Sequence, residues 1–313
     1  MNGFLLVDKP IGLSSFGALQ QLNKKFSIQR RAGKIGHGGT LDPYASGLLV
    51  IAIGKATRFL RYFLGSDKRY IADLKFGQRT SSDDVEGEVI ATADYSHIQR
   101  EQVETALSAF RGRIMQVPPA FSAVHVDGKR AYHLARKGRN VDLPAKEIDI
   151  HRIEILECKL PDEPFLQLDV ECSGGTYIRS IARDLGQALG SEAHLIGLRR
   201  TNACHFDIQQ AKSLDFLMAQ DDIEQFIHPC AEAMSIYPEI TPSSAKLHRL
   251  FNGLPVNFNI SKDGIYTLKF HDELVAVLER KDGKNDFLRL FSDIEFKDLE
   301  KSVQSNQIPR KDS

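Results

Sequence analysis

The residues best suited to chemistry lie at positions 36–47, which read Gly-His-Gly-Gly-Thr-Leu-Asp-Pro-Tyr-Ala-Ser-Gly. Three glycines in four positions permit unusual backbone angles and close approach of another molecule. Asp42 precedes Pro43, which favours an extended backbone, and the apolar residues 48–53 that follow predict a buried central strand. A carboxylate held where a loop meets a rigid strand is well placed for catalysis. Taken alone, the fragment favours a simpler interpretation, a turn in which Asp42 bonds its own backbone.

Two further segments carry residues that could act with this carboxylate. Across residues 172–180 a strand is expected to end at a Gly-Gly turn and a helix to begin with Thr176 as cap, which puts Arg179 in the first helical turn. The helix dipole disfavours a cation there, so a carboxylate partner would stabilise it; a surface salt bridge is the alternative. Tyr70 shares a strand face with apolar residues, where an aromatic is more often core than catalytic.

Composition restricts the partners. The 313 residues contain 41 Lys and Arg and 41 Asp and Glu, so the formal net charge is zero and only a local basic patch could bind nucleic acid. Residues 111–139 form such a patch, with seven Lys or Arg and one acid, although a charge run is usually a solvated face. The four cysteines form no CxxC pair, which predicts reduced thiols and a cytoplasmic setting. No apolar run is long enough to span a bilayer.

The hydrophobic pattern predicts a mixture of strands and helices. Period-two alternation predicts a strand over residues 70–76, and apolar runs predict strands at 150–156 and 166–172. Spacings of three and four predict helices at 102–110 and 178–189. Because regular βαβ alternation is absent, the predicted fold class is α+β.

The pattern changes after Pro238. Short strands separated by turns then predict a small β-rich module over residues 235–291, which leaves 1–234 as the main domain. Residues 292–313 are polar and without periodicity, and are predicted to be a disordered tail.

Other kinds of chemistry lack their signatures. The sequence has no GxxxxGK[ST] nucleotide loop, no HExxH and no GxSxG elbow, and its ten histidines are scattered. The sequence therefore predicts neither a cofactor nor a metal site.

Several segments, in order, resemble the bacterial tRNA pseudouridine-55 synthases, the TruB family. They begin with Val-Asp-Lys-Pro at the N-terminus and include the Asp42 segment, which is highly specific. Departures are few: Gly38 stands where many members have Thr, and Ser82 replaces the usual Thr. The segments that carry the resemblance are 7–10, 36–47, 67–70 followed by 77–80 with Ser82, Asp84 and Gly87, 116–123, 175–179 and 198–200.

The resemblance implies a mixed, mostly antiparallel sheet flanked by helices, with a PUA-like C-terminal module that binds RNA. It implies that uridine 55 in the T loop of tRNA is flipped out and isomerised to pseudouridine. Asp42 would be the nucleophile, attacking the anomeric carbon or assisting a glycal route. Arg179 would pair with Asp42 and lower its pKa. Tyr70 would stack on the target base.

Other residues take implied supporting roles. Tyr177 and Leu198 would wall the pocket, His37 would fill the space left by the extruded base, and Lys9 would support the site. Residues 111–143 would form a thumb that grips the RNA through contacts with phosphates. The phosphate-binding residues implied by the resemblance are Lys129, Arg130, Arg136, Lys137 and Arg139.

The resemblance further implies a monomer that acts on the tRNA T stem-loop, without a membrane or an obligatory protein partner. Two alternatives stay open. The chain could be a noncatalytic factor that helps tRNA to fold, a role that could coexist with catalysis. It could also be a guide-RNA-directed synthase of the archaeal and eukaryotic kind, which its short N-terminus and modest C-terminal module disfavour.

Overall fold

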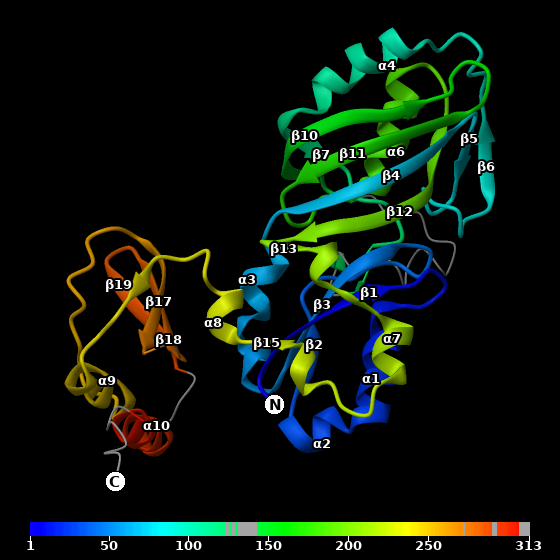
Figure 1. Cartoon of the computed structure of the whole chain (residues 1–313). Coiled ribbons are helices and arrows are strands. Elements are labelled where there is room, and N and C mark those ends of the chain that lie inside the picture. The colour runs from blue at the N-terminus through cyan, green and yellow to red at the C-terminus, as the bar shows by residue number, and fades with distance from the viewer. Residues whose placement is uncertain (123–124, 127–128, 131–142, 272, 290–292, 307–313) are drawn as a thin grey trace.

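The computed structural model describes residues 1–122, 125–126, 129–130, 143–271, 273–289 and 293–306, in a large lobe and a smaller one (Figure 1). A long twisted sheet runs through the large lobe. Its strand order is β14-β1-β3-β12-β4-β11-β10-β7. In that order the bounds are Lys212–Ser213, Gly3–Lys9, Ser46–Ile53, Ala193–Ala203, Lys68–Phe76, Phe165–Cys172, Lys146–Cys158 and Gly112–Gln116.

Neighbouring strands of this sheet are mostly antiparallel. The parallel neighbours along the order are β1 with β14 and β3 with β12. Short strands β2 (Ile35–His37), β13 (Phe206–Asp207) and β15 (Ile227–His228) pair with β3, β12 and β1. The expected α+β class with a mixed, mostly antiparallel sheet is therefore confirmed.

Helices and short turns complete the large lobe. The α-helices are α1 (Ser15–Phe26), α2 (Ile28–Ala32), α3 (Leu60–Leu64), α4 (Arg100–Leu107), α6 (Ile178–Ala188), α7 (Leu214–Ala219) and α8 (Cys230–Ala233). The 3₁₀ turns are η1 (Gly54–Phe59), η2 (Ser108–Phe110), η3 (Ile208–Gln210) and η4 (Glu224–Phe226). Two small ribbons, β5 (Gln78–Thr80) with β6 (Val89–Thr92) and β8 (His125–Val126) with β9 (Lys129–Arg130), lie outside the main sheet.

The burial pattern explains why β3 and β4 look different in sequence. In β4 alternate residues are buried, because one face packs against the core and the other does not. In β3 the even-numbered residues enter one hydrophobic cluster and the odd-numbered residues enter another, so both faces are covered. A strand covered on both faces reads as a continuous apolar run, as observed here.

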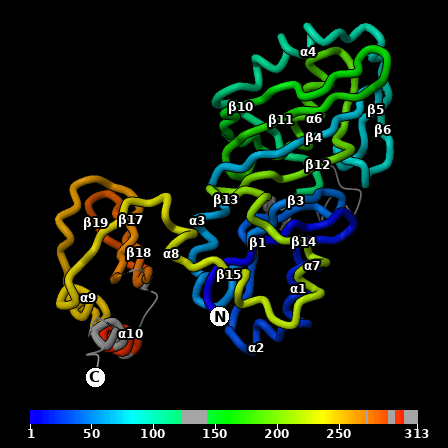
Figure 2. Tube along the Cα trace, in the orientation of Figure 1, coloured from blue at the N-terminus to red at the C-terminus, as the bar shows by residue number. Residues whose placement is uncertain are grey.

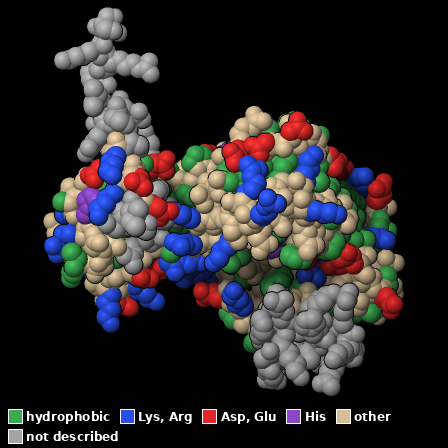
Figure 3. Space-filling model, turned by 90° about the horizontal axis from the view of Figure 1, so that it is seen from below, with side chains coloured by type: hydrophobic (Ala, Val, Ile, Leu, Met, Phe, Trp, Pro, Cys, Tyr) green, Lys and Arg blue, Asp and Glu red, His purple; other side chains and the backbone are tan. Residues whose placement is uncertain are grey.

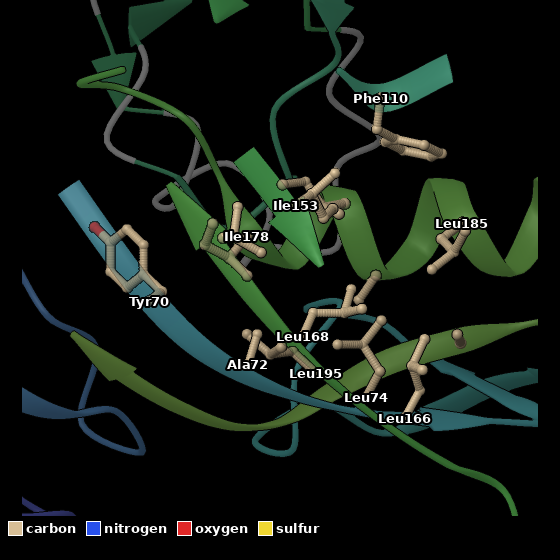
Figure 4. Packing of buried hydrophobic residues seen from close by; sticks show 14 of the residues in the cluster. Tyr70, Ala72, Leu74, Phe110, Ile153, Leu166, Leu168, Ile178, Leu185 and Leu195 are labelled. Carbon is tan, nitrogen blue, oxygen red and sulfur yellow. The ribbon is translucent and has the colours of Figure 1, made fainter. Parts of the chain in front are cut away.

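Helix α6 covers the buried face of β4 and its neighbours. Ile178 and Leu185 of the helix face Leu168 of β11 and Leu74 of β4 (Figure 4). The helix ends at Ala188, shortly before Gly190, whose φ of 70° suits glycine. The predicted helix is thereby confirmed, and it fixes Arg179 in its first turn against the sheet.

The small lobe has its own sheet and core. Its sheet follows the order β16 (Glu239–Ile240), β17 (Gly264–Phe270), β18 (Glu273–Lys281) and β19 (Lys284–Arg289). Helices α9 (Ser244–Phe251) and α10 (Asp293–Asn306) pack on it. The predicted disordered tail is wrong for residues 293–306, because Phe296 is fully buried in this core and anchors α10.

The two lobes touch through apolar and charged contacts. Leu274 and Val277 of β18 join the hydrophobic cluster that contains Phe4 and Phe59 of the large lobe. Arg61 also pairs with Glu279 at 3.0 Å. The chain trace and the space-filling view show a narrower junction between the lobes, where Lys and Arg side chains gather on the face seen from below (Figures 2 and 3).

No helix in the part of the chain that the structure describes is long and apolar enough to cross a membrane.

Candidate active site

Five of the residues singled out in the sequence line one cavity of about 560 Å³. They come from four places in the chain: the loop before β3, strand β4, the start of α6 and strand β12. The sheet brings them together, because β12 lies between β3 and β4. These five residues are Asp42, Tyr70, Tyr177, Arg179 and Leu198.

The loop that carries Asp42 is fixed by its neighbours. The hydroxyl of Ser15 accepts a hydrogen bond from the Leu41 backbone N–H at 2.7 Å and donates to the Leu41 carbonyl at 2.9 Å. The Ala45 N–H donates to the Asp42 carbonyl at 3.1 Å, which forms the turn into β3. The carboxylate of Asp42 instead contacts Arg179. The simpler interpretation, in which this side chain bonds its own backbone in a turn, is therefore not what the structure shows.

Arg179 is held between two carboxylates. Its Nη2 lies 3.2 Å from Asp42 Oδ2, and its Nη1 lies 3.0 Å from Asp84 Oδ2. The same guanidinium donates to the carbonyls of Ser82 at 3.3 Å and Phe121 at 3.1 Å. The ion pair between Arg179 and Asp42 that the resemblance implies is present. It is not isolated, because the same guanidinium also pairs with Asp84.

Asp84 was not among the site residues inferred from the sequence. Its side chain is 3% exposed, and Ser82 Oγ donates a hydrogen bond to its carboxylate. It belongs to a turn between β5 and β6 and reaches α6 across 95 residues of sequence. The only available signal was its place in a segment that resembles the family, since local periodicity says nothing about such a distant partner.

The pKa of Asp42 moves in the opposite direction from that expected. Burial raises the pKa of this carboxyl; Arg179 lowers it, Asp84 raises it and Lys9 lowers it, each by less than burial does. The expectation considered only the cation and is therefore wrong in its net direction. The negative charge of Asp84, on the same guanidinium, opposes the stabilisation that Arg179 gives to the ionised form of Asp42.

Aromatic and apolar groups form the rest of the wall. Tyr70 is 8% exposed on the buried face of β4, and burial raises the pKa of its hydroxyl while Arg200 lowers it. Leu198 of β12 pairs with Ala72 of β4, two residues along the strand from Tyr70, and lines the same cavity. The backbone of Tyr177 is clamped by Gln116, whose side chain accepts from its N–H at 2.9 Å and donates to its carbonyl at 3.1 Å.

Lys9 and His37 lie outside the lining of this cavity. Lys9 is fully buried, and its Nζ donates to the carbonyls of Pro10 at 2.8 Å and Leu13 at 2.6 Å, which supports the loop after β1. Burial lowers the pKa of Lys9 to about 8. His37 lies on β2, and burial lowers the pKa of its ring.

The basic patch is only partly described. Lys129 and Arg130 form the short strand β9, which pairs with β8. Arg136, Lys137 and Arg139 lie outside the described residues.

Two buried cations of the cavity were missed as site residues, although both lie in segments that resemble the family. They are Lys68, which is 7% exposed, and Arg200, which is 1% exposed. A buried cation cannot be recognised from the pattern of a strand, because lysine and arginine at such positions look like surface residues.

Comparison with known proteins identifies the chain's relatives. Residues 24–178 match the family described as TruB family pseudouridylate synthase (N terminal domain), and residues 179–235 match the tRNA pseudouridylate synthase B C-terminal domain. A Mycobacterium leprae protein named tRNA pseudouridine synthase B is 38% identical over 90% of this chain and 88% of its own length. One of the same name from Phocaeicola vulgatus is 46% identical over 72% of this chain and 96% of its own length.

Solved structures share the fold. A chain in a structure described as a Cbf5-Nop10-Gar1 complex matches with a TM-score of 0.69 and 24% identity, covering 94% of this chain and 86% of that one. An archaeal box H/ACA sRNP Nop10-Cbf5 complex gives a TM-score of 0.68 and 23% identity, covering 94% of this chain and 88% of that one. The sequence relatives and the two matching domains mean that this chain belongs to the TruB family of pseudouridylate synthases.

Proposed function

We propose that this protein is a tRNA pseudouridine synthase that isomerises uridine 55 in the T loop to pseudouridine. The names and similarity of its relatives support the substrate and the reaction. The observation that carries the proposal is the carboxylate of Asp42, which lines a cavity and contacts the buried guanidinium of Arg179 at 3.2 Å.

The chemistry needs an ionised carboxylate beside the ribose of an extruded nucleotide. A base stacked in the T loop hides its anomeric carbon, so the uridine must swing out, at a cost of about a few kcal/mol. Asp42 then acts as the nucleophile, or removes a proton in the glycal route. Arg179 orients the carboxylate and favours its charged form against the effect of burial.

The remaining lining residues receive and shield the base. We assign stacking on the base to Tyr70, and exclusion of water to Tyr177 and Leu198, because all three line the same cavity. His37 and Lys9 take supporting roles outside it, and the contacts of Lys9 with backbone carbonyls agree with that assignment.

RNA binding is assigned to a thumb at residues 111–143 and to the small module at 235–291, with catalysis in residues 1–234. Phosphate contacts by the thumb would give affinity rather than sequence choice. We further propose that the protein acts as a monomer, needs no protein partner, and works in the cytoplasm, where tRNA is modified.

The thumb can be tested by salt titration. If about three phosphates are neutralised by its cations, the logarithm of tRNA affinity should fall with the logarithm of salt concentration with a slope of roughly −2. Filter binding of a T stem-loop at several ionic strengths measures this slope. A flat response would contradict the thumb assignment.

The reaction is tested by replacing the nucleophile. Asp42→Asn is expected to bind a T stem-loop as wild type does and to form no pseudouridine, because the amide has no charge with which to attack. Mass-spectrometric mapping of a bare tRNA transcript measures the product, and Asp94→Asn, at an exposed carboxylate, is the matched control.

Two results would contradict parts of the proposal, and a third would separate the chemistry from any effect on tRNA folding. Turnover by Asp42→Asn near that of wild type would remove the nucleophile assignment. A requirement for a guide RNA or for added proteins would favour a guide-directed enzyme. Unchanged tRNA annealing by Asp42→Asn would show that any effect on tRNA folding is separate from the chemistry.

A further inference from the structure

Arg200 is a fully buried cation whose charge the site described above does not use. Its Nε donates to the Leu48 carbonyl at 2.7 Å, and its Nη2 donates to the Gly39 carbonyl at 3.1 Å. Only 1% of the residue is exposed, and the ion pairs of the described residues include no carboxylate for it. A buried charge without a counter-charge is costly, so its presence calls for an explanation.

The backbone around Arg200 leaves room for this side chain at the cavity. Arg200 on β12 lies opposite Tyr70 of β4 on one side and opposite Gly47 of β3 on the other. Gly39 has a φ of +134°, and a Cβ there would lie 3.4 Å from Arg200 Nη1. At Gly47 a Cβ would lie only 2.3 Å from the Arg200 carbonyl oxygen. Gly47 thus lets β3 approach the backbone of Arg200 closely, and Gly39 brings the loop before β3 against its guanidinium.

Lys68 adds a second cation to the same wall. Its Nζ donates to the carbonyls of Phe63 at 3.1 Å and Ser66 at 2.5 Å, and it lines the cavity together with Arg200 and Tyr70. Burial, and to a smaller extent the positive charge of Arg200, lowers the pKa of Lys68 to about 8. Arg200 stays charged under all ordinary conditions and is therefore the dependable positive charge of this wall.

The proposed reaction creates a negative charge in this cavity. When the bond between C1′ and N1 breaks, its electron pair leaves with N1, and uracil becomes an anion. This holds whether the Asp42 carboxylate forms an ester at C1′ or takes the C2′ proton. C5 of uracil then bonds to C1′, Asp42 is regenerated, the C5 proton is lost and N1 gains a proton. Substrate and product are isomers, and no oxidant or co-reactant enters.

We propose that Arg200 stabilises the uracil anion that forms when the glycosidic bond breaks. The inference rests on the function proposed above and adds a residue to it. A fixed cation aimed at a developing charge in a site that excludes water is an effective form of catalysis. Arg179 cannot take this role, since its guanidinium is already shared by Asp42 and Asp84. Arg200 instead donates to the carbonyls of Leu48 and Gly39 and to the hydroxyl of Tyr70, all neutral groups, so no carboxylate among the described residues offsets its charge.

The test varies the leaving group as well as the protein. Fluorine at C5 withdraws electrons from uracil and makes its anion a better leaving group that needs less stabilisation. Arg200→Gln should lower the single-turnover rate of glycosidic bond cleavage about 10²–10³-fold with a uridine T stem-loop, by analogy with loss of an oxyanion donor. With 5-fluorouridine at the same position the loss should be about tenfold or less. Chromatography of nuclease digests measures consumption of each nucleoside.

Arg200→Lys and Arg199→Gln are the matched variants. Lysine keeps the charge, so it should stay within about tenfold of wild type on both substrates. Arg199 is the next residue on β12, is 43% exposed in its side chain and pairs with Asp8; its replacement should change neither rate by more than about threefold. Equal losses on the two substrates with Arg200→Gln would overturn the proposal, because a purely structural defect ignores the leaving group.

Two measurements keep the result interpretable. Thermal melting and T stem-loop binding report whether Arg200→Gln is folded. If it is not folded, Arg200→Lys is the deciding variant. A large loss of cleavage rate in Arg200→Lys that is equal on both substrates overturns the proposal. Failure of the proposed function looks different, since wild type would then make no pseudouridine at all. Failure of this inference leaves wild type active and removes only the dependence on the leaving group.

Discussion

Arg179 and Arg200 are both buried and both line the cavity that contains Asp42, but their surroundings differ. Arg179 on α6 contacts Asp42 and Asp84, whereas Arg200 on β12 donates to the carbonyls of Leu48 and Gly39 and to the hydroxyl of Tyr70. One guanidinium is neutralised twice and the other is not neutralised by any carboxylate among the described residues. Similar burial therefore says little about the role of an arginine until its counter-charges are counted.

The difference divides the cavity into two walls. On the Arg179 wall, charges are fixed before the substrate arrives, which serves to orient the carboxylate of Asp42. On the Arg200 wall, positive charge lacks a fixed partner, which suits a negative charge that appears only during the reaction. Variants of the first wall should therefore change how the reaction rate depends on pH through Asp42, the proposed nucleophile. Variants of the second wall should change how the rate depends on the leaving group.

The largest effect on the first wall is expected from Arg179→Met. Loss of the guanidinium removes the group that opposes the effect of burial, so the pKa of Asp42 should rise further. The acid limb of kcat/KM, which reports the free enzyme, should move to higher pH. At neutral pH the rate should fall about 10³-fold. Pseudouridine formation across a pH series measures both changes.

Thermal melting and T stem-loop binding control for the fold of this variant. Normal rates with an unmoved acid limb would remove the ion-pair argument for Asp42.

A smaller effect of opposite sign is expected from Asp84→Asn. Asp84 raises the pKa of Asp42, so its neutralisation should lower that pKa and move the acid limb to lower pH. The amide oxygen can still accept from Arg179, and the neutral-pH rate should fall only about tenfold. The same pH series measures this change, with Asp94→Asn as the control. A shift in the same direction as that of Arg179→Met would refute the picture of one guanidinium shared by two carboxylates.

The sequence predicted the periodic parts of this molecule well. The alternation in β4 and the apolar stripe of α6 both appear where expected, because each pattern reports directly which face is buried. The class of fold followed from the absence of βαβ order and from the resemblance. The prediction of a disordered tail failed because Phe296 is fully buried and anchors α10, although the composition of this segment is polar.

The site divides in the same way. The geometry around Asp42 and Arg179 was anticipated only through the family resemblance, since their segments are 137 positions apart. The second carboxylate, Asp84, and the buried cations Lys68 and Arg200 were not assigned roles. Strand periodicity treats a lysine or an arginine as a surface residue, and no local pattern reveals a cross-strand partner or the net effect of burial on a pKa.

The smallest effect is expected at Tyr44, near the first wall. Its hydroxyl is buried, has no hydrogen-bond partner among the described residues, and has a pKa raised by burial. An unsatisfied buried hydroxyl costs stability, so Tyr44→Phe should increase the free energy of unfolding by about 1 kcal/mol. Activity should stay within about threefold of wild type. Arg179 pairs with Asp42 and Asp84 and does not depend on the Tyr44 hydroxyl for a partner. Urea denaturation measures the stability, and Tyr62→Phe is the control.

The control separates an unpaired hydroxyl from a paired one. Tyr62 accepts a hydrogen bond from Arg61 Nη2 at 2.7 Å, so its loss should leave stability unchanged or slightly lower. If Tyr44→Phe instead destabilises the protein, or slows the reaction more than tenfold, the hydroxyl has a partner in solution or in the complex with RNA. The Arg179 wall would then include a third polar group, and its charges would not be fully arranged before the substrate binds.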